Sequence, residues 1–420
     1  MWFIGVDVGG TFTDFHAMNI SDGRVCLHKT PSTPSDPSES IINGLSTLLE
    51  DNQIDVEDVV RLAHGTTVAT NALIQRRGGK VAVVTTEGFK DLLEIGRQIR
   101  PKMYDLKADN PLPLSDRHMR FEITERVGSK GQIIKPLSDD SIKNIIKIVN
   151  ESKADACAVC LLFSFLMPEH EKKIGDELRK SIPGLHVSLS AEVQPEFREY
   201  ERFSTTLLNA YLQPMIGRYM QSLGEKFTKK APNARLGINQ SSGGLMSVER
   251  AVAMPIRTAL SGPAAGTVGA IYQAKLGKKP NIITLDMGGT SADVALIQNY
   301  ESGIGYNRMV ADFPVRLPMI DIHTVGAGGG SVAWFDKDNL MKVGPLSAGA
   351  EPGPACYSRG GTEATVSDAN LILGRLPDSL IGGAMVLDIK KAKTAILPIA
   401  KRLGFSIERT AHGILGIVIS

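Results

Sequence analysis

The pattern of apolar and polar residues contains one arrangement twice. An apolar, β-branched run at Phe3 to Val6 leads into Asp7 to Asp14 (DVGGTFTD), and a second run at Ile282 to Leu285 leads into Asp286 to Asp293 (DMGGTSAD). Both copies follow the pattern D-x-G-G-T-x-x-D, so they match at five positions. An apolar run that enters a Gly-Gly turn is typical of a strand leading into a tight hairpin. We therefore predict two β-hairpins of the same kind.

Elsewhere the apolar positions switch repeatedly between strand and helix periods, which predicts an α/β fold. The predicted strands include 80–85, 154–165 and 234–239, and the predicted helices include 37–49, 139–149 and 388–403. The charged stretch Glu196 to Glu201 suggests a boundary, so we expect one domain over 1–195 and another over 196–420. His412 to Ile419 is apolar on every side, so we expect the second domain to be C-terminally truncated.

Composition narrows the class of protein. The chain has 420 residues, 42% of them hydrophobic and 22% charged, which is typical of a globular protein of two or three domains. A net charge of +2 gives no basic excess for nucleic acid or an anionic membrane. The longest nearly continuous apolar run, Ala156 to Met167, is too short for a bilayer, and Asp7 interrupts the N-terminal run, which excludes a signal peptide. We expect a cytoplasmic protein.

The repeated hairpin carries groups that suit a nucleotide. Glycines let the backbone approach a ligand closely, and successive N–H groups in a turn form an anion-binding nest. The threonine hydroxyls can add hydrogen bonds, and the leading aspartates, Asp7 and Asp286, can hold a hard cation such as Mg²⁺. Two such hairpins facing each other would hold a nucleotide's phosphates from both sides. The alternative is a pair of ordinary glycine turns.

A second group of polar residues is found where predicted strands and helices end. His64, Thr66, Thr67 and Asn71 follow the apolar start of one strand, in a stretch with more hydroxyls than helix capping needs. Arg97 ends a helix, and Asp321 and His323 precede a glycine-rich turn. Ligand sites of α/β proteins form at such element ends, so we take these residues as candidates for substrate contacts. Capping and satisfied burial remain the alternative for each.

Other catalytic patterns are missing or incomplete. The chain has no G-x-x-x-x-G-K-[ST] motif for a P-loop and no G-x-S-x-G elbow for a serine hydrolase. Gly326 to Ser331 has a serine where a dinucleotide fingerprint needs its third glycine. His170-Glu171 begins a zincin motif that fails at Ile174. Cys157 and Cys160 lie inside an apolar strand, so we interpret them as core residues.

The paired hairpins resemble the phosphate loops of the actin, Hsp70 and sugar-kinase superfamily. Five further stretches resemble the hydantoinase A family, which includes the N-methylhydantoinase subunit, the N-terminal half of 5-oxoprolinase and the acetone carboxylase β subunit. These stretches are 64–73 (HGTTVATNAL), 261–266 (SGPAAG), 286–291 (DMGGTS), 324–331 (TVGAGGGS) and 352–357 (PGPACY). The resemblance covers essentially the whole chain and implies two ribonuclease-H-like domains, the second incomplete.

The resemblance implies an A-type subunit of an ATP-dependent cyclic amidohydrolase. ATP with Mg²⁺ would phosphorylate the ring carbonyl of a hydantoin, an N-methylhydantoin or 5-oxoproline, since an unactivated amide is a poor electrophile. Phosphoryl transfer needs positioning and charge neutralisation more than protein nucleophiles. The implied metal ligands are Asp7 and Asp286, with His64 and His323 as further catalytic candidates. The implied nucleotide-binding residues are Gly9, Gly10, Thr11, Thr13, Asp14, Gly288, Gly289, Thr290, Ser291 and Asp293.

Two departures from the family pattern matter. Ala292 stands where Thr13 stands in the first copy, and we expect the lost hydroxyl to weaken a phosphate or water contact. The family's subunit continues well beyond residue 420, and the segment that contacts adenosine is expected there. The resemblance also implies a B-type partner subunit, while a homo-oligomer stays open. The alternatives are a ketone carboxylase β subunit, a sugar kinase, and an actin- or Hsp70-like nucleotide-binding or truncated inactive protein.

Overall fold

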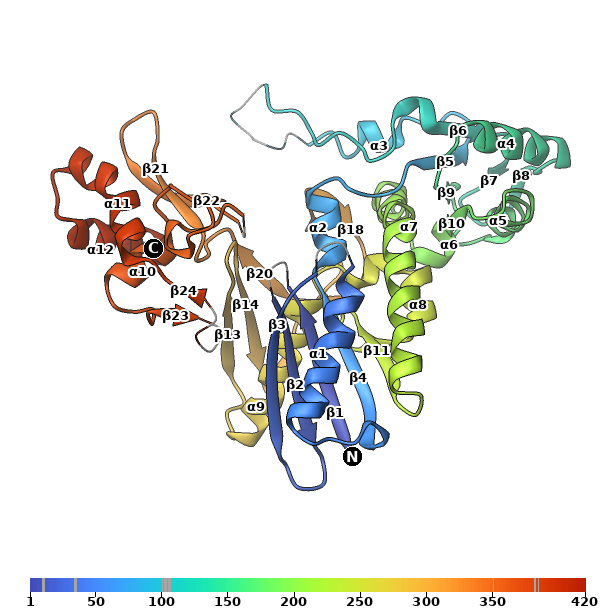
Figure 1. The fold of residues 1–420 in the computed structure, drawn as a ribbon. Helices are drawn as coiled ribbons and strands as arrows, with labels where there is room; N and C mark the ends of the chain where they lie inside the picture. The colour runs from blue at the N-terminus through green and yellow to red at the C-terminus, as the bar shows by residue number, and fades with distance from the viewer. Residues whose placement is uncertain are drawn as a thin grey trace. The chain divides into compact units, whose positions relative to one another are not determined.

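The computed structural model forms two compact units. It describes residues 1–9, 12–33, 36–99, 101, 104, 107–349, 351–380, 383 and 385–420. The first unit comprises Met1–Ala265 and Ile304–Ile320, and the second comprises Gly266–Gly303 and Asp321–Ser420 (Figure 1). Gly10 and Thr11, to which the resemblance assigns phosphate contacts, lie outside the described residues. None of the described helices combines the length and the apolar character that a bilayer crossing needs.

A six-stranded mixed sheet forms the centre of the first unit. Its order is β12-β11-β4-β1-β2-β3, in which β1, β2 and β3 are antiparallel while β4 and β11 run parallel to β1. These strands are β1 (Trp2–Val8), β2 (Phe12–Asn19), β3 (Val25–Pro31), β4 (Val59–Thr66), β11 (Arg235–Asn239) and β12 (Leu245–Met246). Trp2, Ile4, Val6 and Val8 are buried and alternate with more exposed residues, as expected for a strand with one covered face.

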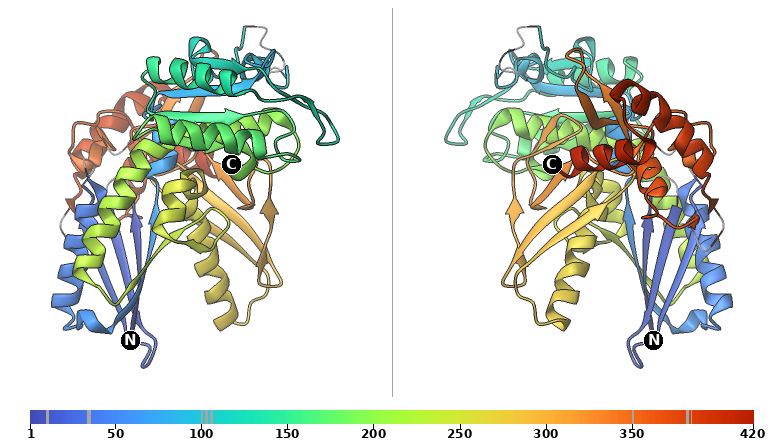
Figure 2. Two further views of the ribbon diagram at one scale, coloured as in Figure 1. Left: turned by 90° about the vertical axis from the view of Figure 1, so that its right-hand side faces the viewer. Right: turned by 90° about the vertical axis from the view of Figure 1, so that its left-hand side faces the viewer.

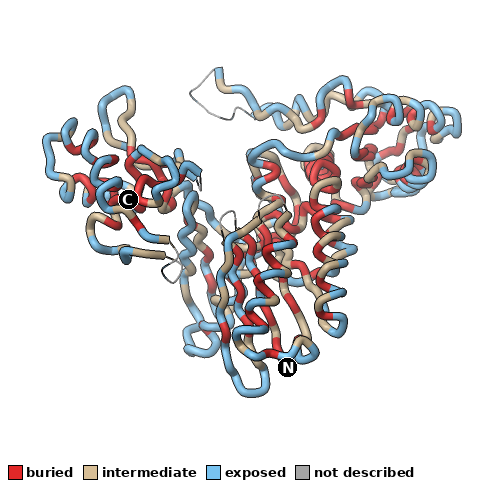
Figure 3. The backbone as a smooth tube through the Cα atoms, viewed as in Figure 1, coloured by how far each residue is buried: buried red, intermediate tan, exposed pale blue. Residues whose placement is uncertain are grey.

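Helices α1 (Pro37–Asp51) and α7 (Glu199–Lys230) contribute to the core over this sheet. Asp36 caps α1 by accepting a hydrogen bond from the Ser38 N–H, and Pro37 follows at the first helical position. Figure 2 shows α1 beside the blue strands β1–β3. Buried residues concentrate in these strands and in α7 (Figure 3). The N-terminal half of α7 is buried on all sides because it also packs against a second sheet.

The second sheet of the first unit is entirely parallel, in the order β10-β9-β5-β6. Its strands are β5 (Val81–Thr86), β6 (Arg120–Ile123), β9 (Ala156–Cys160) and β10 (His186–Leu189), and its main helices are α4 (Asp139–Glu151) and α5 (Glu169–Ser181). Every residue of β9 is buried, as in other parallel sheets. Cys157 and Cys160 are therefore core residues, as predicted, and burial raises the pKa of Cys157 to about 12.

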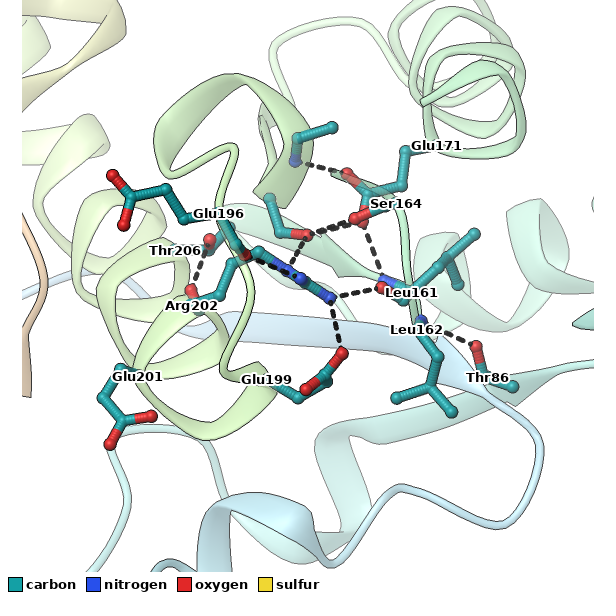
Figure 4. A network of polar contacts seen from close by, with 12 residues as sticks. Thr86, Leu161, Leu162, Ser164, Glu171, Glu196, Glu199, Glu201, Arg202 and Thr206 are labelled. Carbon is teal, nitrogen blue, oxygen red and sulfur yellow. Dashed lines mark hydrogen bonds and ion pairs between the residues drawn. The ribbon is translucent and has the colours of Figure 1, made fainter. Parts of the chain in front are cut away.

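A buried polar network attaches α7 to this second sheet (Figure 4). The Arg202 guanidinium donates to the Leu161 carbonyl at 2.8 Å and to the Ser190 hydroxyl at 3.2 Å. Glu171 accepts from the Leu161 N–H at 2.7 Å and from the Ser190 hydroxyl at 2.6 Å. Burial raises the pKa of Glu171 and lowers that of Arg202, while the charge of each partner opposes the shift. The network explains why α7 belongs to the first unit.

The first unit also contains several short elements. They are α2 (Val68–Ile74), α3 (Leu92–Ile95), β7 (Arg126–Val127), β8 (Ile133–Lys135), α6 (Ser190–Val193), α8 (Val248–Ala253), β16 (Ile304–Gly305), β17 (Arg308–Val310), β18 (Phe313–Val315) and β19 (Met319–Ile320). The boundary between the compact units does not coincide with the division predicted at residues 195 and 196. The two domains predicted over 1–195 and 196–420 therefore stay a prediction.

The second unit contains the other predicted hairpin. Strand β14 (Ala292–Gln298) is antiparallel to β13 (Ile282–Met287), β15 (Glu301–Ser302) and β20 (Ile322–Val325). In Figure 2, β13 and β14 are drawn in yellow and orange. The yellow helix α9 (Ser261–Leu276) precedes them in the sequence. The remaining elements are β21 (Ser331–Phe335), β22 (Met341–Ser347), α10 (Val366–Ile372), β23 (Ser379–Leu380), β24 (Met385–Val386), α11 (Ile389–Leu403) and α12 (Ile407–Ile419). Ala411, Ile414 and Leu415 of α12 join a hydrophobic cluster with α10 and α11.

Candidate functional site

The first hairpin joins β1 to β2 through a glycine turn. The Gly9 N–H donates to the Phe12 carbonyl at 2.9 Å and closes the turn. Asp7 lies opposite Asp14 in the strand register, so both carboxylates belong to the same face. Asp14 forms an ion pair with Lys29 on β3 at 2.6 Å, which attaches it to the neighbouring strand. Asp14 is therefore held within the sheet, and its assignment as a nucleotide-binding residue stays a prediction.

Three parallel strands end beside Asp7. Asp7 is in register with Gly65 on β4, and Asn239 ends β11 on the other side of β4. A Cβ atom at Gly65 would lie 3.2 Å from Asp7 Oδ1 and 3.3 Å from Asn239 Nδ2. Glycine therefore keeps a space open between a carboxylate and an amide at the carboxyl ends of the strands, where α/β proteins place their ligands.

The N-terminus of α9 reaches the same place. A Cβ atom at Gly262, in the first turn of this 16-residue helix, would lie 3.6 Å from Asp7 Oδ1. Ser261 Oγ donates to the Thr66 carbonyl at 3.2 Å, which holds the start of α9 against the end of β4. A helix N-terminus favours anions. Strand ends and a helix N-terminus thus converge on Asp7.

Thr67 and Asn71 continue this surface on α2. The Thr67 hydroxyl donates to the Val8 carbonyl at 3.3 Å, and Asn71 Nδ2 donates to Thr67 Oγ1 at 3.3 Å. Thr66 Oγ1 accepts from the Val68 N–H at 3.1 Å, which is a local capping contact. The structure therefore brings Thr66, Thr67 and Asn71 close to the hairpin, although each already has a hydrogen bond within the protein, and their role in substrate contact stays a prediction.

His64 faces the interior. It is fully buried on β4, and its Nε2 lies 2.6 Å from the Tyr219 hydroxyl of α7. Burial lowers the pKa of His64 from its usual 6.5 to about 4, so the ring is neutral at neutral pH. Burial also raises the pKa of Tyr219. This placement favours burial in the core over contact with a substrate, although the Nδ1 atom of His64 has no hydrogen-bond partner among the described residues. The contact of Nε2 with Tyr219 attaches β4 to α7.

Thr13 also lies beneath the hairpin. Its side chain is fully buried and lies within hydrogen-bonding distance of the Ser32 and Ser40 hydroxyls, at 3.0 and 3.1 Å. Ser32 in turn donates to the Gly9 carbonyl at 2.9 Å. The hydroxyl that Ala292 lacks in the second copy is therefore an internal support. Our expectation that its loss weakens a phosphate or water contact is corrected by this burial.

The second hairpin repeats the geometry of the first. The Gly288 N–H donates to the Ser291 carbonyl at 2.9 Å, and Asp286 lies opposite Asp293. The Thr324 hydroxyl donates to Asp293 Oδ1 at 2.6 Å. Burial raises the pKa of Asp293 and the nearby Asp286 charge adds to this effect, while the Thr324 hydrogen bond opposes it. Two neighbouring carboxylates of like charge suit a cation.

The glycine-rich segment 326–330 supports this second turn. The N–H groups of Gly329 and Gly330 donate to the Gly288 and Gly289 carbonyls at 3.0 and 2.6 Å. A Cβ atom at Gly328 would lie 2.7 Å from the backbone of Gly289 and Thr290, so only glycine allows this approach. The segment therefore holds the turn in place, a role that its similarity to a dinucleotide fingerprint did not suggest.

Asp7 and Asp286 fit a magnesium nucleotide, because they offer the type and number of oxygen ligands that Mg²⁺ takes from a protein. Among the described residues, no group of three or more His, Cys, Asp or Glu side chains forms a dedicated metal cage. Mg²⁺ is usually bound by one or two carboxylates together with water and substrate phosphates, which is what Asp7 or Asp286 can offer. The open space that Gly65 and Gly262 leave at Asp7 is consistent with this.

The structure does not gather the other candidates at the first hairpin. Arg97 pairs with Glu201 through its Nε at 2.8 Å and lines a separate cavity of about 1020 Å³ in the first unit. Asp321 and His323 are exposed at β20 of the second unit. Sequence reasoning assigned no role to Asn239, Tyr219 or Ser261. A polar residue at the end of a strand is the signal that could have revealed Asn239.

The relatives that match nearly all of this chain are longer, and the chain spans about three fifths of their length. The caprolactamase subunit alpha of Pseudomonas jessenii is 38% identical over 427 residues, covering 99% of this chain and 61% of that subunit. The 5-oxoprolinase of Saccharomyces cerevisiae is 34% identical and is covered over 32% of its length, with 89% of this chain matched.

Two solved structures share the fold. The ATP-dependent caprolactamase from Pseudomonas jessenii has a TM-score of 0.83 at 38% identity, covering 99% of this chain and 61% of that chain. Nucleotide-free acetone carboxylase has a TM-score of 0.82 at 29% identity, covering 98% and 60%. The hydantoinase/oxoprolinase N-terminal region model matches residues 3–182, and the hydantoinase/oxoprolinase model matches 202–420. This chain belongs to the hydantoinase/oxoprolinase family.

Proposed function

We propose that the chain is the A-type subunit of an ATP-dependent cyclic amidohydrolase that phosphorylates a ring carbonyl before hydrolysis. The observation that carries the proposal is the repeated turn, which has the same register and the same closing hydrogen bond in both hairpins. The ribonuclease-H-like domains implied by the resemblance are also part of the proposal. The order β11-β4-β1-β2-β3, with three antiparallel strands followed by parallel ones, supports this for the first unit.

Different residues of each hairpin close the turn, contact the phosphates and hold the metal ion in this proposal. The N–H groups of Gly9 and Gly288 close the turns, so phosphate contacts fall to the turn residues after them, such as Gly289 and Thr290. Asp7 and Asp286 would hold Mg²⁺, which neutralises charge on the phosphates when bound. The start of α9, beside Asp7, favours an anion. The chain thus positions the phosphates and the protein needs no nucleophile of its own.

The proposed substrate class and partner subunit are inferred from the relatives. The caprolactamase subunit alpha and the 5-oxoprolinases are named for cyclic amides, which supports a cyclic amide substrate. We place the substrate beside Thr67 and Asn71, which line the surface next to the hairpin, whereas Thr66 is buried beneath them. Further parts of the proposal are a B-type partner subunit and a cytoplasmic location. Arg97, Asp321 and His323 stay candidates for substrate contacts.

A ketone carboxylase subunit is the second candidate. The fold match to acetone carboxylase and the 35% identity to the acetophenone carboxylase gamma subunit of Aromatoleum aromaticum favour it. Both candidates activate a carbonyl compound with ATP, so they share the hairpins and differ in the acceptor.

The test measures phosphate release from Mg-ATP by the chain assembled with its B-type partner, in the presence of caprolactam, hydantoins, 5-oxoproline, acetone or acetophenone. Release that depends on a cyclic amide supports the first candidate, and release that depends on a ketone supports the second. Asp286→Asn is expected to lower kcat more than a hundredfold, whereas Asp338→Asn, in an exposed turn, leaves it unchanged. Absence of substrate-dependent release with every compound would contradict both.

A further inference from the structure

Asp7, Gly65 and Asn239 form one row across three parallel strands of the first sheet. Asp7 of β1 pairs with Gly65 of β4, and Ile238 of β11 pairs with His64 of β4, which places Asn239 beside Gly65. The residue before each member of this row is buried in the core. Because successive side chains of a strand point to opposite faces, the row itself lies on the other face, at the carboxyl ends of the strands.

The side chains of Asp7 and Asn239 approach each other over Gly65. A Cβ atom at Gly65 would lie 3.2 Å from Asp7 Oδ1 and 3.3 Å from Asn239 Nδ2, so the gap between these two atoms is no wider than the sum of the two distances. Asn239 is partly exposed, and within the described part of the chain its carboxamide has no hydrogen bond to another residue. The carboxamides of Asn71 and Gln240, in contrast, each donate to another residue. Asn239 is therefore the carboxamide here that keeps its hydrogen-bonding groups for a ligand.

A carboxamide suits a neutral ligand that presents a donor and an acceptor side by side. Its NH₂ group donates, its carbonyl oxygen accepts, and the two lie in one plane, so it can form two hydrogen bonds at once. The ring of a cyclic amide holds the amide group cis, so the ring N–H and C=O also point to one side. A phosphate with acceptors only, or a ketone without an N–H, engages no more than one of the two groups. The carboxamide therefore matches a cyclic amide better than either.

We propose that Asn239 is a specificity-determining residue that binds the cis-amide group of the substrate ring. Its NH₂ group donates to the ring carbonyl oxygen, and its own carbonyl accepts from the ring N–H. Nδ2 is the Asn239 atom nearest to Gly65, so the bound ring carbonyl lies towards Asp7, to which the proposed function assigns the metal ion. This inference rests on the proposed function, because it takes the substrate to be a cyclic amide.

The test compares cyclic amides that differ only at the ring N–H. Phosphate release from Mg-ATP is measured with caprolactam and 5-oxoproline, each beside its N-methyl derivative, using the complete chain assembled with its B-type partner. Asn239→Leu keeps the approximate size of the side chain and removes both hydrogen-bonding groups. It should lower kcat/KM for the N–H compounds at least tenfold and for the N-methyl compounds less than twofold. Asn239→Ser, a smaller change, should shift the preference in the same direction.

Two controls separate recognition of the ring from a structural role. Gln240→Leu removes a neighbouring carboxamide that donates to the Leu245 carbonyl at 3.3 Å, and it should change turnover of both kinds of compound by the same factor. Binding of Mg-ADP, measured by calorimetry without a cyclic amide, should be the same for Asn239→Leu and the wild type. Weaker Mg-ADP binding by Asn239→Leu would assign Asn239 to the phosphates and overturn the inference.

The outcomes also separate this inference from the proposed function. If the wild type turns over a cyclic amide but Asn239→Leu and Asn239→Ser keep the full preference for the ring N–H, the inference fails and the proposed function stands. Equal losses on the N–H and N-methyl compounds would likewise reduce Asn239 to a structural residue. If no cyclic amide stimulates phosphate release by the wild type, both fail.

Discussion

At the first hairpin, a residue without a side chain does much to define the site. Gly65 lies between Asp7 and Asn239, and a Cβ atom there would sit 3.2 and 3.3 Å from their polar atoms. These distances are tighter than ordinary van der Waals contact, so either the carboxylate or the amide must shift. The shape of the space beside Asp7 therefore depends on this glycine, which the sequence motif contains but does not explain.

We expect Gly65→Ala to lower kcat/KM for Mg-ATP roughly ten- to hundredfold, because small misplacements of a positioned group are costly in phosphoryl transfer. Steady-state phosphate release by the assembled enzyme measures this. Gly266→Ala is the matched control, since nothing lies within 4 Å of its added Cβ atom and it should retain activity. Equal activities of the two variants would show that the space at Asp7 is not used.

His64 gives the fold a defined response to acid. Its pKa of about 4 in the folded protein lies below its usual 6.5, so the unfolded chain binds a proton at this site between these values while the folded chain does not. Its contribution to stability is present above pH 6.5 and lost as the pH falls towards 4. The difference between the two pKa values corresponds to about 3 kcal/mol.

Urea unfolding at pH 7 and at pH 4.5 should therefore show a smaller loss of stability for His64→Gln than for the wild type. The exposed His16 provides the comparison, because His16→Gln should lose as much stability as the wild type does. If His64→Gln and His16→Gln respond alike to acid, the neutral buried state of His64 is disproved.

At the scale of the elements, α7 is the part that links the two sheets of the first unit. The contacts of Arg202 and Glu171 lie where α7 meets the end of β9. Arg202 and Glu171 share the Ser190 hydroxyl and the Leu161 backbone as partners, and Arg202 also pairs with Glu199 at 3.8 Å. Removing either buried charge leaves the network incomplete, and breaking a buried charge network typically costs about 3–5 kcal/mol. We expect Arg202→Met to destabilise the protein by about this amount in urea unfolding. The double variant Arg202→Met/Glu171→Gln should be more stable than the sum of the single effects predicts, and strict additivity would contradict the coupling.

Sequence reasoning worked best for these elements where the signal is local. The two hairpins and the buried cysteines of β9 are confirmed because each depends on neighbouring residues. Long-range burial was the weak point. His64 is buried because Tyr219 approaches it from 155 residues away, and no periodicity near residue 64 contains that contact. The pairing of Arg97 with Glu201 was hidden in the same way.

At the scale of the whole molecule, each unit carries one aspartate, Asp7 or Asp286, just before a glycine turn. A ligand that binds only the folded state raises stability, by about 2.7 kcal/mol at a hundred times its Kd. We expect Mg-ATP to stabilise the assembled protein against thermal unfolding, and EDTA to remove most of this effect. Asp7→Asn should reduce the stabilisation, while Asp338→Asn should not. A stabilisation by ATP that is insensitive to EDTA and to Asp7→Asn would contradict the metal role of the aspartates.

The supports beneath the two turns have a consequence for the history of the chain. Ser32 and Ser40 hold Thr13 under the first turn, whereas the second turn has Ala292 at this position and is held by backbone N–H groups of the segment 326–330. A shared register with unrelated supports is what duplication followed by divergence produces. If only the turn residues were exchanged between the two copies, each turn would therefore lie on supporting residues that evolved with the other turn.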